Sequence, residues 1–223
     1  MINKNEWMKE IIDKLLHNFD KKLIFVGLQG SYQRGEATEE SDFDVVVILD
    51  DLSLDDLSSY RKIVSTMPES DKACGFISGR EELSNWPKNE IFQFSQETEA
   101  YYGDIIKLLP PNTEEDILRS IKIETANLYH YLCHLYVHGN FDTLDEELKQ
   151  AYKSAFFIVQ LKYYIDTKTY ISSKCNLIDM IGGTEKEILK TNMNWNELKE
   201  DIENNKDRYF ELLFEWCKKI ICM

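Results

Sequence analysis

Hydrophobic and polar residues alternate along the first half of the chain in patterns typical of both helices and strands. Apolar residues recur every three or four positions over residues 4–19, which predicts an amphipathic helix. Two short apolar runs, LIFVGLQ at 23–29 and DFDVVVIL at 42–49, predict strands, and the Val-Val-Val-Ile segment of the second indicates burial on both faces. The stretch between them, GSYQRGEATEES, is polar and is expected to form a turn.

A second group of elements is expected to continue this sheet. Ser53 and Asp56 have the spacing of a capping box, which predicts a helix that ends before Pro68. Two further segments, ACGFIS at 73–78 and IFQFS at 91–95, are predicted to be strands of the same sheet.

The pattern changes beyond residue 97, where helical periodicity replaces strands. A Pro-Pro pair at 110–111 marks the clearest break, and a helix over about 114–138 is expected to end at Gly139. Three capping pairs predict the starts of helices: Thr113 with Asp116, Thr143 with Glu146, and Asn194 with Glu197. The second of these helices is expected to run to about residue 167 and the third nearly to the C-terminus. The chain is therefore expected to be α+β, with an α/β domain over residues 1–109 and an all-helical domain over 112–223.

Composition and charge indicate which classes of binding partner suit the chain. The chain has 223 residues, 43% hydrophobic and 30% charged, with a formal net charge of −14. Such an acidic chain should repel nucleic acid, and suits a cationic partner or a nucleotide that arrives with a divalent metal. No apolar run approaches the roughly 18 residues that a membrane-spanning helix needs. The cysteines are scattered and the N-terminus is unlike a signal peptide, which favours a reduced, cytoplasmic setting. The sequence does not predict the oligomeric state.

Two carboxylates at the start of the second strand are the strongest chemical signal. Residues two apart in a strand point to the same side, so Asp42 and Asp44 should project together. Neighbouring carboxylates repel unless a cation lies between them, and Mg²⁺ prefers a few carboxylates plus substrate phosphates. Upstream, Gly30 lets the backbone approach a phosphate closely, and the Ser31 hydroxyl can hydrogen-bond it.

The order of these residues resembles a known signature. GLQGSYQRGEATEESDFDVVVIL is similar to the motif of the DNA polymerase β-like nucleotidyltransferase superfamily, and its Arg34–Ala37 spacer and Ser41 resemble the small bacterial branch of minimal nucleotidyltransferases and antibiotic adenylyltransferases. This resemblance implies a small mixed-sheet domain that transfers a nucleoside monophosphate, expected to be AMP, from an NTP to a hydroxyl group of a small, aminoglycoside-like acceptor. It also implies that Gly30, Ser31, Arg34 and Ser41 bind the nucleotide and that Asp42 and Asp44 bind Mg²⁺.

The third carboxylate of that superfamily has no obvious counterpart here. It is expected on the strand at 73–78, where Cys74 and Gly75 stand instead of an acid. If the chain is an active transferase, another carboxylate must act as the general base, and we expect Glu97 or Glu124 rather than the acidic pair at 81–82.

Other patterns leave alternatives open. His130, His134 and His138 share one helix face and suggest either a metal site or, preferably, a polar stripe. Three functions remain: a nucleotidyltransferase acting on a small acceptor, a binding or regulatory module that has lost catalysis, and a protein-modifying minimal nucleotidyltransferase. A carboxylate within reach of Asp42 and Asp44 would favour an enzyme over a binding module.

Overall fold

The computed structural model describes residues 3–140 and 144–223. Contacts between Cα atoms divide the chain into two compact units, Met1–Asn112 and Thr113–Met223. Each unit is described by itself below.

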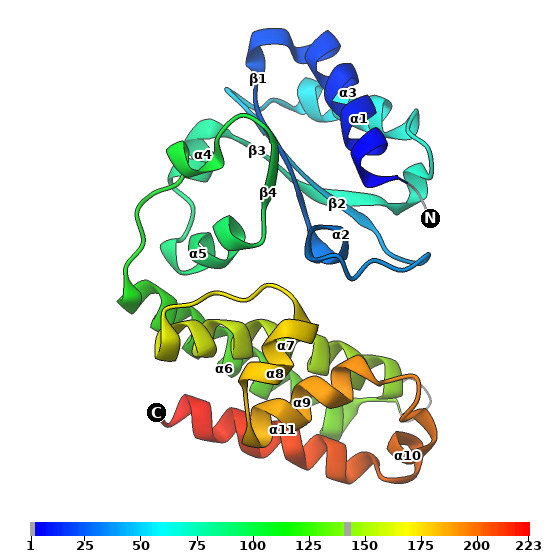
Figure 1. The fold of residues 1–223 in the computed structure, drawn as a ribbon, viewed down its shortest axis with the longest axis vertical. Coiled ribbons are helices and arrows are strands. Elements are labelled where there is room, and N and C mark those ends of the chain that lie inside the picture. Colours follow the sequence, from blue (N-terminus) through cyan, green and yellow to red (C-terminus); the bar gives the residue numbers. More distant parts are fainter. Residues whose placement is uncertain (1–2, 141–143) are drawn as a thin grey trace. The chain divides into compact units, whose positions relative to one another are not determined.

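The first unit combines a four-stranded sheet with helices, as Figure 1 shows in blue to green. Its elements are α1 (Lys4–Phe19), β1 (Leu23–Gln29), α2 (Gly30–Arg34), β2 (Phe43–Leu49), α3 (Leu54–Ser65), β3 (Ala73–Gly79), α4 (Arg80–Ser84), α5 (Lys88–Gln96) and β4 (Glu99–Tyr102), with short 3-10 turns at Asp20–Lys22, Ser70–Lys72 and Ile105–Lys107. The expected helix over 4–19 is confirmed, and so is the capping box that begins α3.

The strands lie in the order β3-β2-β1-β4. β1 runs antiparallel to both β2 and β4, whereas β2 and β3 are parallel, so the predicted mixed sheet is confirmed. The central strand β2 is buried along almost its whole length, as its Val-Val-Val-Ile segment indicated.

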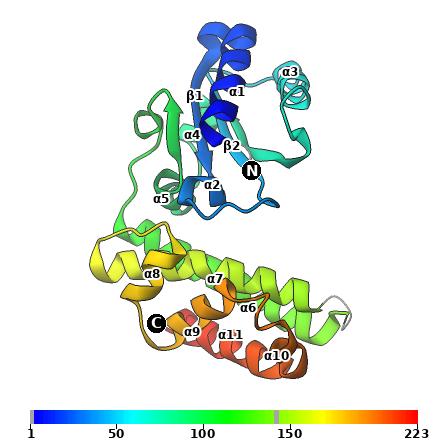
Figure 2. The ribbon, with the colours of Figure 1, turned by 45° about the vertical axis from the view of Figure 1, so that its right-hand side comes forward.

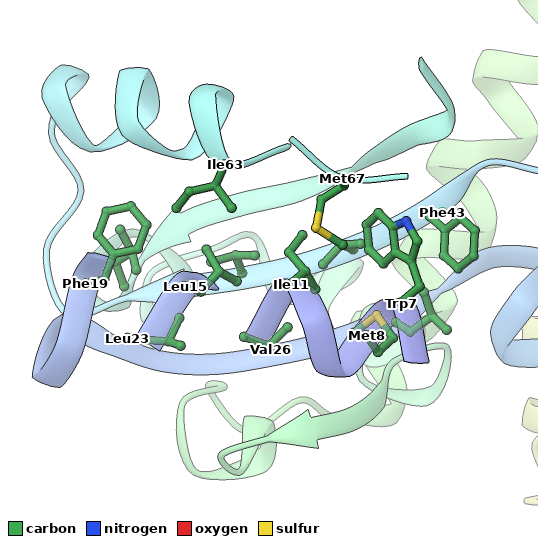
Figure 3. Packing of buried hydrophobic residues seen from close by; sticks show 14 of the residues in the cluster. Trp7, Met8, Ile11, Leu15, Phe19, Leu23, Val26, Phe43, Ile63 and Met67 are labelled. Atoms are coloured by element: carbon green, nitrogen blue, oxygen red, sulfur yellow. The ribbon is translucent and has the colours of Figure 1, made fainter. Parts of the chain in front are cut away.

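Helices cover both faces of this sheet, with α1 and α3 on one face and α4 and α5 on the other (Figures 1 and 2). Alternate residues of β2 therefore enter different cores. Phe43, Val45 and Val47 pack with the apolar face of α1, as Figure 3 shows for Phe43. Val46 and Ile48 pack with residues of α4 and α5 on the opposite face. This alternation decides which way the residues at the start of β2 point.

Two expectations for the first unit were wrong. Residues 91–95, predicted to be a strand, lie in helix α5, where Ile91 and Phe92 are buried and the Ser95 hydroxyl donates to the Phe92 carbonyl. A short run of mixed apolar and polar residues suits either structure, and here it packs as a helix beneath the sheet. The polar stretch that follows β1 was expected to be a turn, but its first five residues form the short helix α2.

Within residues 113–140 and 144–223, the second unit contains helices joined by loops and no strands. Its helices are α6 (Glu114–His138), α7 (Leu144–Thr167), α8 (Lys174–Met180), α9 (Gly183–Met193), α10 (Lys199–Asn204) and α11 (Lys206–Ile221). α6 packs against α7 and α11, and α7 also packs against α9. Within residues 3–140 and 144–223, no helix is long and apolar enough to cross a membrane.

The predicted caps of the second unit had different outcomes. The Thr113–Asp116 capping box begins α6 as expected, and α6 ends before Gly139. Thr143 lies outside the described residues. The prediction that Asn194 and Glu197 begin the last helix was wrong, because Asn194 ends α9 and its carbonyl accepts from the Glu197 backbone in a turn. The last helix, α11, begins at Lys206.

Candidate functional site

The two aspartates stand at the start of β2. Asp44 is half-buried in the strand, and Asp42 is exposed directly before it. By the alternation of β2, Asp44 shares its face of the sheet with Val46 and Ile48, whereas Asp42 directly precedes the strand. The joint projection of Asp42 and Asp44 from this strand end stays a prediction.

Phe43, between the two aspartates, is held on the opposite face by an aromatic stack. Its ring lies 4.5 Å from the Trp7 ring and 4.0 Å from the Tyr32 ring, centroid to centroid, with interplanar angles of 14° and 20°. Figure 3 shows the indole of Trp7 beside Phe43, and the Trp7 Nε1 donates to the Pro68 carbonyl at 2.9 Å. The stack joins α1, β2 and α2, so the start of β2 and the segment after β1 are anchored together.

Gly30 faces Asp44 across the β1–β2 pair. The residue before it, Gln29, pairs in register with Asp44, and Gly30 itself has a φ of 70°. A Cβ atom added at Gly30 would overlap Oδ2 of Asp44. Position 30 thus requires glycine both for its left-handed backbone and for the close approach of a carboxylate.

The two predicted serines lie in the turns that flank these residues. Ser31 is half-buried in α2, and its carbonyl accepts from the Glu36 backbone at 2.8 Å. Ser41 accepts from the Thr38 backbone N–H at 2.8 Å through its hydroxyl, which closes the turn directly before Asp42. In the chain, Ser31 directly follows Gly30 and Ser41 directly precedes Asp42.

Arg34 and Glu97, which the sequence suggested for phosphate contact and base catalysis, are paired with each other. The Arg34 Nη1 lies 2.9 Å from Glu97 Oε2, and its Nε lies 3.2 Å from Glu36 Oε2. The side chains of Arg34 and Glu97 are each only 7% exposed. Because Glu36 also binds this guanidinium, loss of Glu97 leaves Arg34 paired. Loss of Arg34 removes the cation from a buried carboxylate, which typically costs about 3–5 kcal/mol. The two suggested roles stay predictions, and the pairing gives both residues a structural task.

The position beside Asp44 on the next strand is occupied by Cys74. Cys74 pairs in register with Asp44 across the parallel β2–β3 pair and is exposed. Gly75 has a φ of 130°, and a Cβ there would overlap the Val45 carbonyl. An acidic residue at position 75 would therefore need a different backbone, whereas position 74 is the register partner of Asp44.

The remaining acidic candidates lie elsewhere. Glu99 forms an ion pair with Lys4 at 3.1 Å, and Glu124 is exposed in the middle of α6 in the second unit. Among residues 3–140 and 144–223, no group of three or more His, Cys, Asp and Glu side chains is arranged to hold a metal ion. The histidines of α6 form no such group within these residues, although the His134 and His138 rings lie 5.1 Å apart.

Sequence reasoning missed a further contact around Gly30. The Gln29 side-chain amide donates to the Thr98 hydroxyl at 2.7 Å, and Thr98 in turn donates to the Phe94 carbonyl at 2.6 Å. The only local signal was the position of Gln29 directly before the Gly-Ser pair. Its partner is 69 residues away in the sequence, so no short motif could identify it.

Known proteins resemble the chain in fold and in sequence family. No curated protein matches the chain. Among solved structures, the chain is similar to spectinomycin adenyltransferase AAD(9) from Enterococcus faecialis, crystallised with ATP and spectinomycin; the TM-score is 0.61 and the identity 15%, over 99% of this chain and 100% of that chain. At this identity the similarity shows a shared fold. A family model described as a nucleotidyltransferase domain matches residues 8–190. Because this match extends over more than half of the sequence, the chain belongs to the nucleotidyltransferase domain family.

Proposed function

We propose that this chain is a Mg²⁺-dependent nucleotidyltransferase that moves AMP from ATP to a hydroxyl group of a small acceptor. The observation that carries the proposal is the contact between Gly30 and Asp44, which Asp42 precedes by two residues in the chain. It brings a backbone suited to close phosphate approach against a carboxylate suited to a divalent cation, and phosphoryl transfer needs both at one place.

The carboxylates fit the metal that the family implies. Asp42 is exposed and Asp44 half-buried, and the absence of a side chain at position 30 lets Asp44 Oδ2 lie against the backbone of the Gly-Ser segment. Two carboxylates suit Mg²⁺, which usually keeps several waters and takes its other ligands from substrate phosphates. When bound, the ion would neutralise negative charge on the phosphates. In this proposal Asp42 and Asp44 are its protein ligands.

The triphosphate would be bound by the segment that follows β1. Gly30 supplies backbone without a side chain, and the Ser31 hydroxyl supplies a hydrogen bond. Ser41 orders the turn before Asp42 and can donate its hydroxyl proton to a phosphate. Arg34, at the end of α2, is held by Glu36 and Glu97 and adds positive charge near this segment. ATP is the proposed donor, because the structurally similar adenyltransferase was crystallised with it.

The proposed acceptor is a cationic, hydroxyl-bearing small molecule of the aminoglycoside kind. The net charge of −14 favours a cation over a nucleic acid, and the similar adenyltransferase was crystallised with spectinomycin. In the reaction, the acceptor oxygen forms a bond to the α-phosphorus, the bond to the β-phosphate oxygen breaks, and pyrophosphate leaves. The acceptor proton would pass to a carboxylate that acts as the general base. We place this activity in the cytoplasm, where ATP is supplied.

Pyrophosphate release tests the proposal. Purified protein with MgATP is assayed against aminoglycosides, spectinomycin, a lincosamide and protein acceptors, with Asp44→Asn as the inactive control. We expect at least one cationic small molecule to stimulate release in the wild-type protein. Alanine at the true base should then lower turnover by about 10²–10⁴ with MgATP affinity little changed. Stimulation by a protein acceptor alone would contradict the proposed acceptor class.

A binding or regulatory module is the second candidate, and one observation favours it. The strand beside Asp44 carries Cys74 and Gly75, and the backbone at position 75 has no room for an acidic side chain. A module of this kind would bind MgATP, and this binding would be lost when Asp42 or Asp44 is replaced. It would release no pyrophosphate with any acceptor in the panel.

A further inference from the structure

The turn between α5 and β4 touches the Gly-Ser segment on both sides. Glu97 binds Arg34, three residues after Ser31, with 2.9 Å between Nη1 and Oε2. The next residue, Thr98, accepts from the side chain of Gln29, directly before Gly30, at 2.7 Å. Two consecutive residues of one turn therefore hold the two ends of the segment 29–34.

We propose that Glu97 and Thr98 are positioning residues that clamp this segment in the conformation that binds the triphosphate. The inference rests on the proposed function and assigns a role to residues outside the family's signature. It also gives Glu97 a task other than that of a general base.

The geometry favours a clamp over a general base at position 97. A base must present a carboxylate oxygen to the acceptor hydroxyl within hydrogen-bond reach. The Glu97 side chain is 7% exposed, and its Oε2 receives the guanidinium of an arginine that is buried to the same extent. A second carboxylate, Glu36, binds the same guanidinium at 3.2 Å, so the arginine is fixed from both sides.

Contacts from outside are needed to stabilise α2 because this helix is short. Its five residues supply little stability by their own hydrogen bonds, and it begins at a glycine with a φ of 70°. The stack of Tyr32 on Phe43 secures one side of α2, and the Arg34–Glu97 pair secures its end. A binding segment held in advance loses less conformational freedom when the ligand binds, which raises its affinity.

Two variants separate positioning from catalysis. Glu97→Gln keeps the size of the side chain and leaves Arg34 paired with Glu36, while Thr98→Val removes the hydroxyl that Gln29 binds. We expect each to raise the Kd for MgATP about tenfold, as measured by isothermal titration, with turnover at saturating MgATP within about threefold of wild type. Thr98→Ser retains the hydroxyl and should restore wild-type affinity. Arg80→Gln, which breaks the exposed Arg80–Asp50 pair at 3.1 Å in the same unit, should leave affinity unchanged.

Several results would overturn the clamp. Turnover that falls by about 10² or more in Glu97→Gln with unchanged Kd would identify a general base. A lowered melting temperature with unchanged Kd in both variants would show a structural role only. If wild-type protein binds MgATP, loses it on Asp42→Asn, and keeps it in both clamp variants, the proposed function stands and this inference fails. If the wild type binds no MgATP, both fail.

Discussion

Gly30 and Asp44 are in such close contact that a Cβ atom on Gly30 would overlap Oδ2 of Asp44. The contact joins the end of β1 to the start of β2, and it forms because Gln29 and Asp44 are register partners in an antiparallel pair. A left-handed backbone at Gly30, with a φ of 70°, turns the chain away from the strand at this point. One glycine thus brings the proposed phosphate segment and the proposed metal ligand together.

Replacement of Gly30 tests this contact, and Gly35 offers a matched control. Gly35 has nearly the same φ, 71°, but a Cβ there would meet no atom within 4 Å. Alanine in a left-handed conformation costs roughly 1–2 kcal/mol at either position. We expect Gly30→Ala also to displace Asp44 and weaken MgATP binding at least tenfold, whereas Gly35→Ala should bind normally. Equal affinities in the two variants, measured by titration calorimetry, would show that Gly30 is only a turn residue.

Cys74 allows a gain-of-function test. It is the register partner of Asp44 on β3, so an acidic residue there would place a third carboxylate beside the pair. We expect Cys74→Asp to tighten Mg²⁺ binding roughly tenfold, or about 1.4 kcal/mol, as measured by calorimetry in the presence of ATP. Cys175→Asp, at an exposed cysteine of α8, is the control for added charge. Equal effects of the two substitutions would argue against a metal site next to position 74.

The aromatic stack behind the aspartates can be tested by stability. Phe43 lies between Trp7 and Tyr32, and each aromatic pair contributes about 0.5–1.5 kcal/mol beyond its buried area. Phe43→Leu should therefore lower the free energy of unfolding by about 1–3 kcal/mol in a urea titration. An unchanged midpoint would mean that the stack adds nothing to the anchoring of β2.

The cap of α3 predicts a dependence of stability on pH. Hydrogen bonds from Lys22 and Ser53 lower the pKa of Asp56 to about 2. Because this folded-state pKa lies below that of an unfolded aspartate, about 3.9, the ionised cap stabilises the fold above pH 4 and loses this effect as the pH falls toward 2. Asp56→Asn should lower the melting temperature at pH 6, and the difference from wild type should shrink between pH 4 and 2. A difference that is constant over this range would contradict the assigned pKa.

Much of the first unit followed from local patterns. The helix over 4–19, the buried strands around 23–29 and 43–49, and the capping box at Ser53 depend on residues close together in the sequence. β4 was not predicted because it is a four-residue strand at the sheet edge with a mixed sequence, EAYY. The segment 91–95 was mistaken for a strand because five residues cannot distinguish the two periodicities.

The candidate site was predicted where its residues are close in the sequence, and not where folding brings distant residues together. Gly30, Asp42 and Asp44 form one motif, and the register of β1 and β2 places Gly30 next to Asp44. The pairing of Arg34 with Glu97 spans 63 residues, so the sequence offered each of them a separate role. Only the turn after α5 brings them into contact.

Calorimetric titration of MgATP into wild-type protein and into Asp42→Asn and Asp44→Asn tests the central claim most directly. The carboxylates lie at a strand end outside the two apolar cores, so each variant should keep its fold, as checked by circular dichroism and melting temperature. The account predicts saturable, Mg²⁺-dependent binding to the wild-type protein that is lost in both folded variants. Wild-type affinity in both variants would contradict the assignment of Asp42 and Asp44 as the metal ligands of a nucleotidyltransferase.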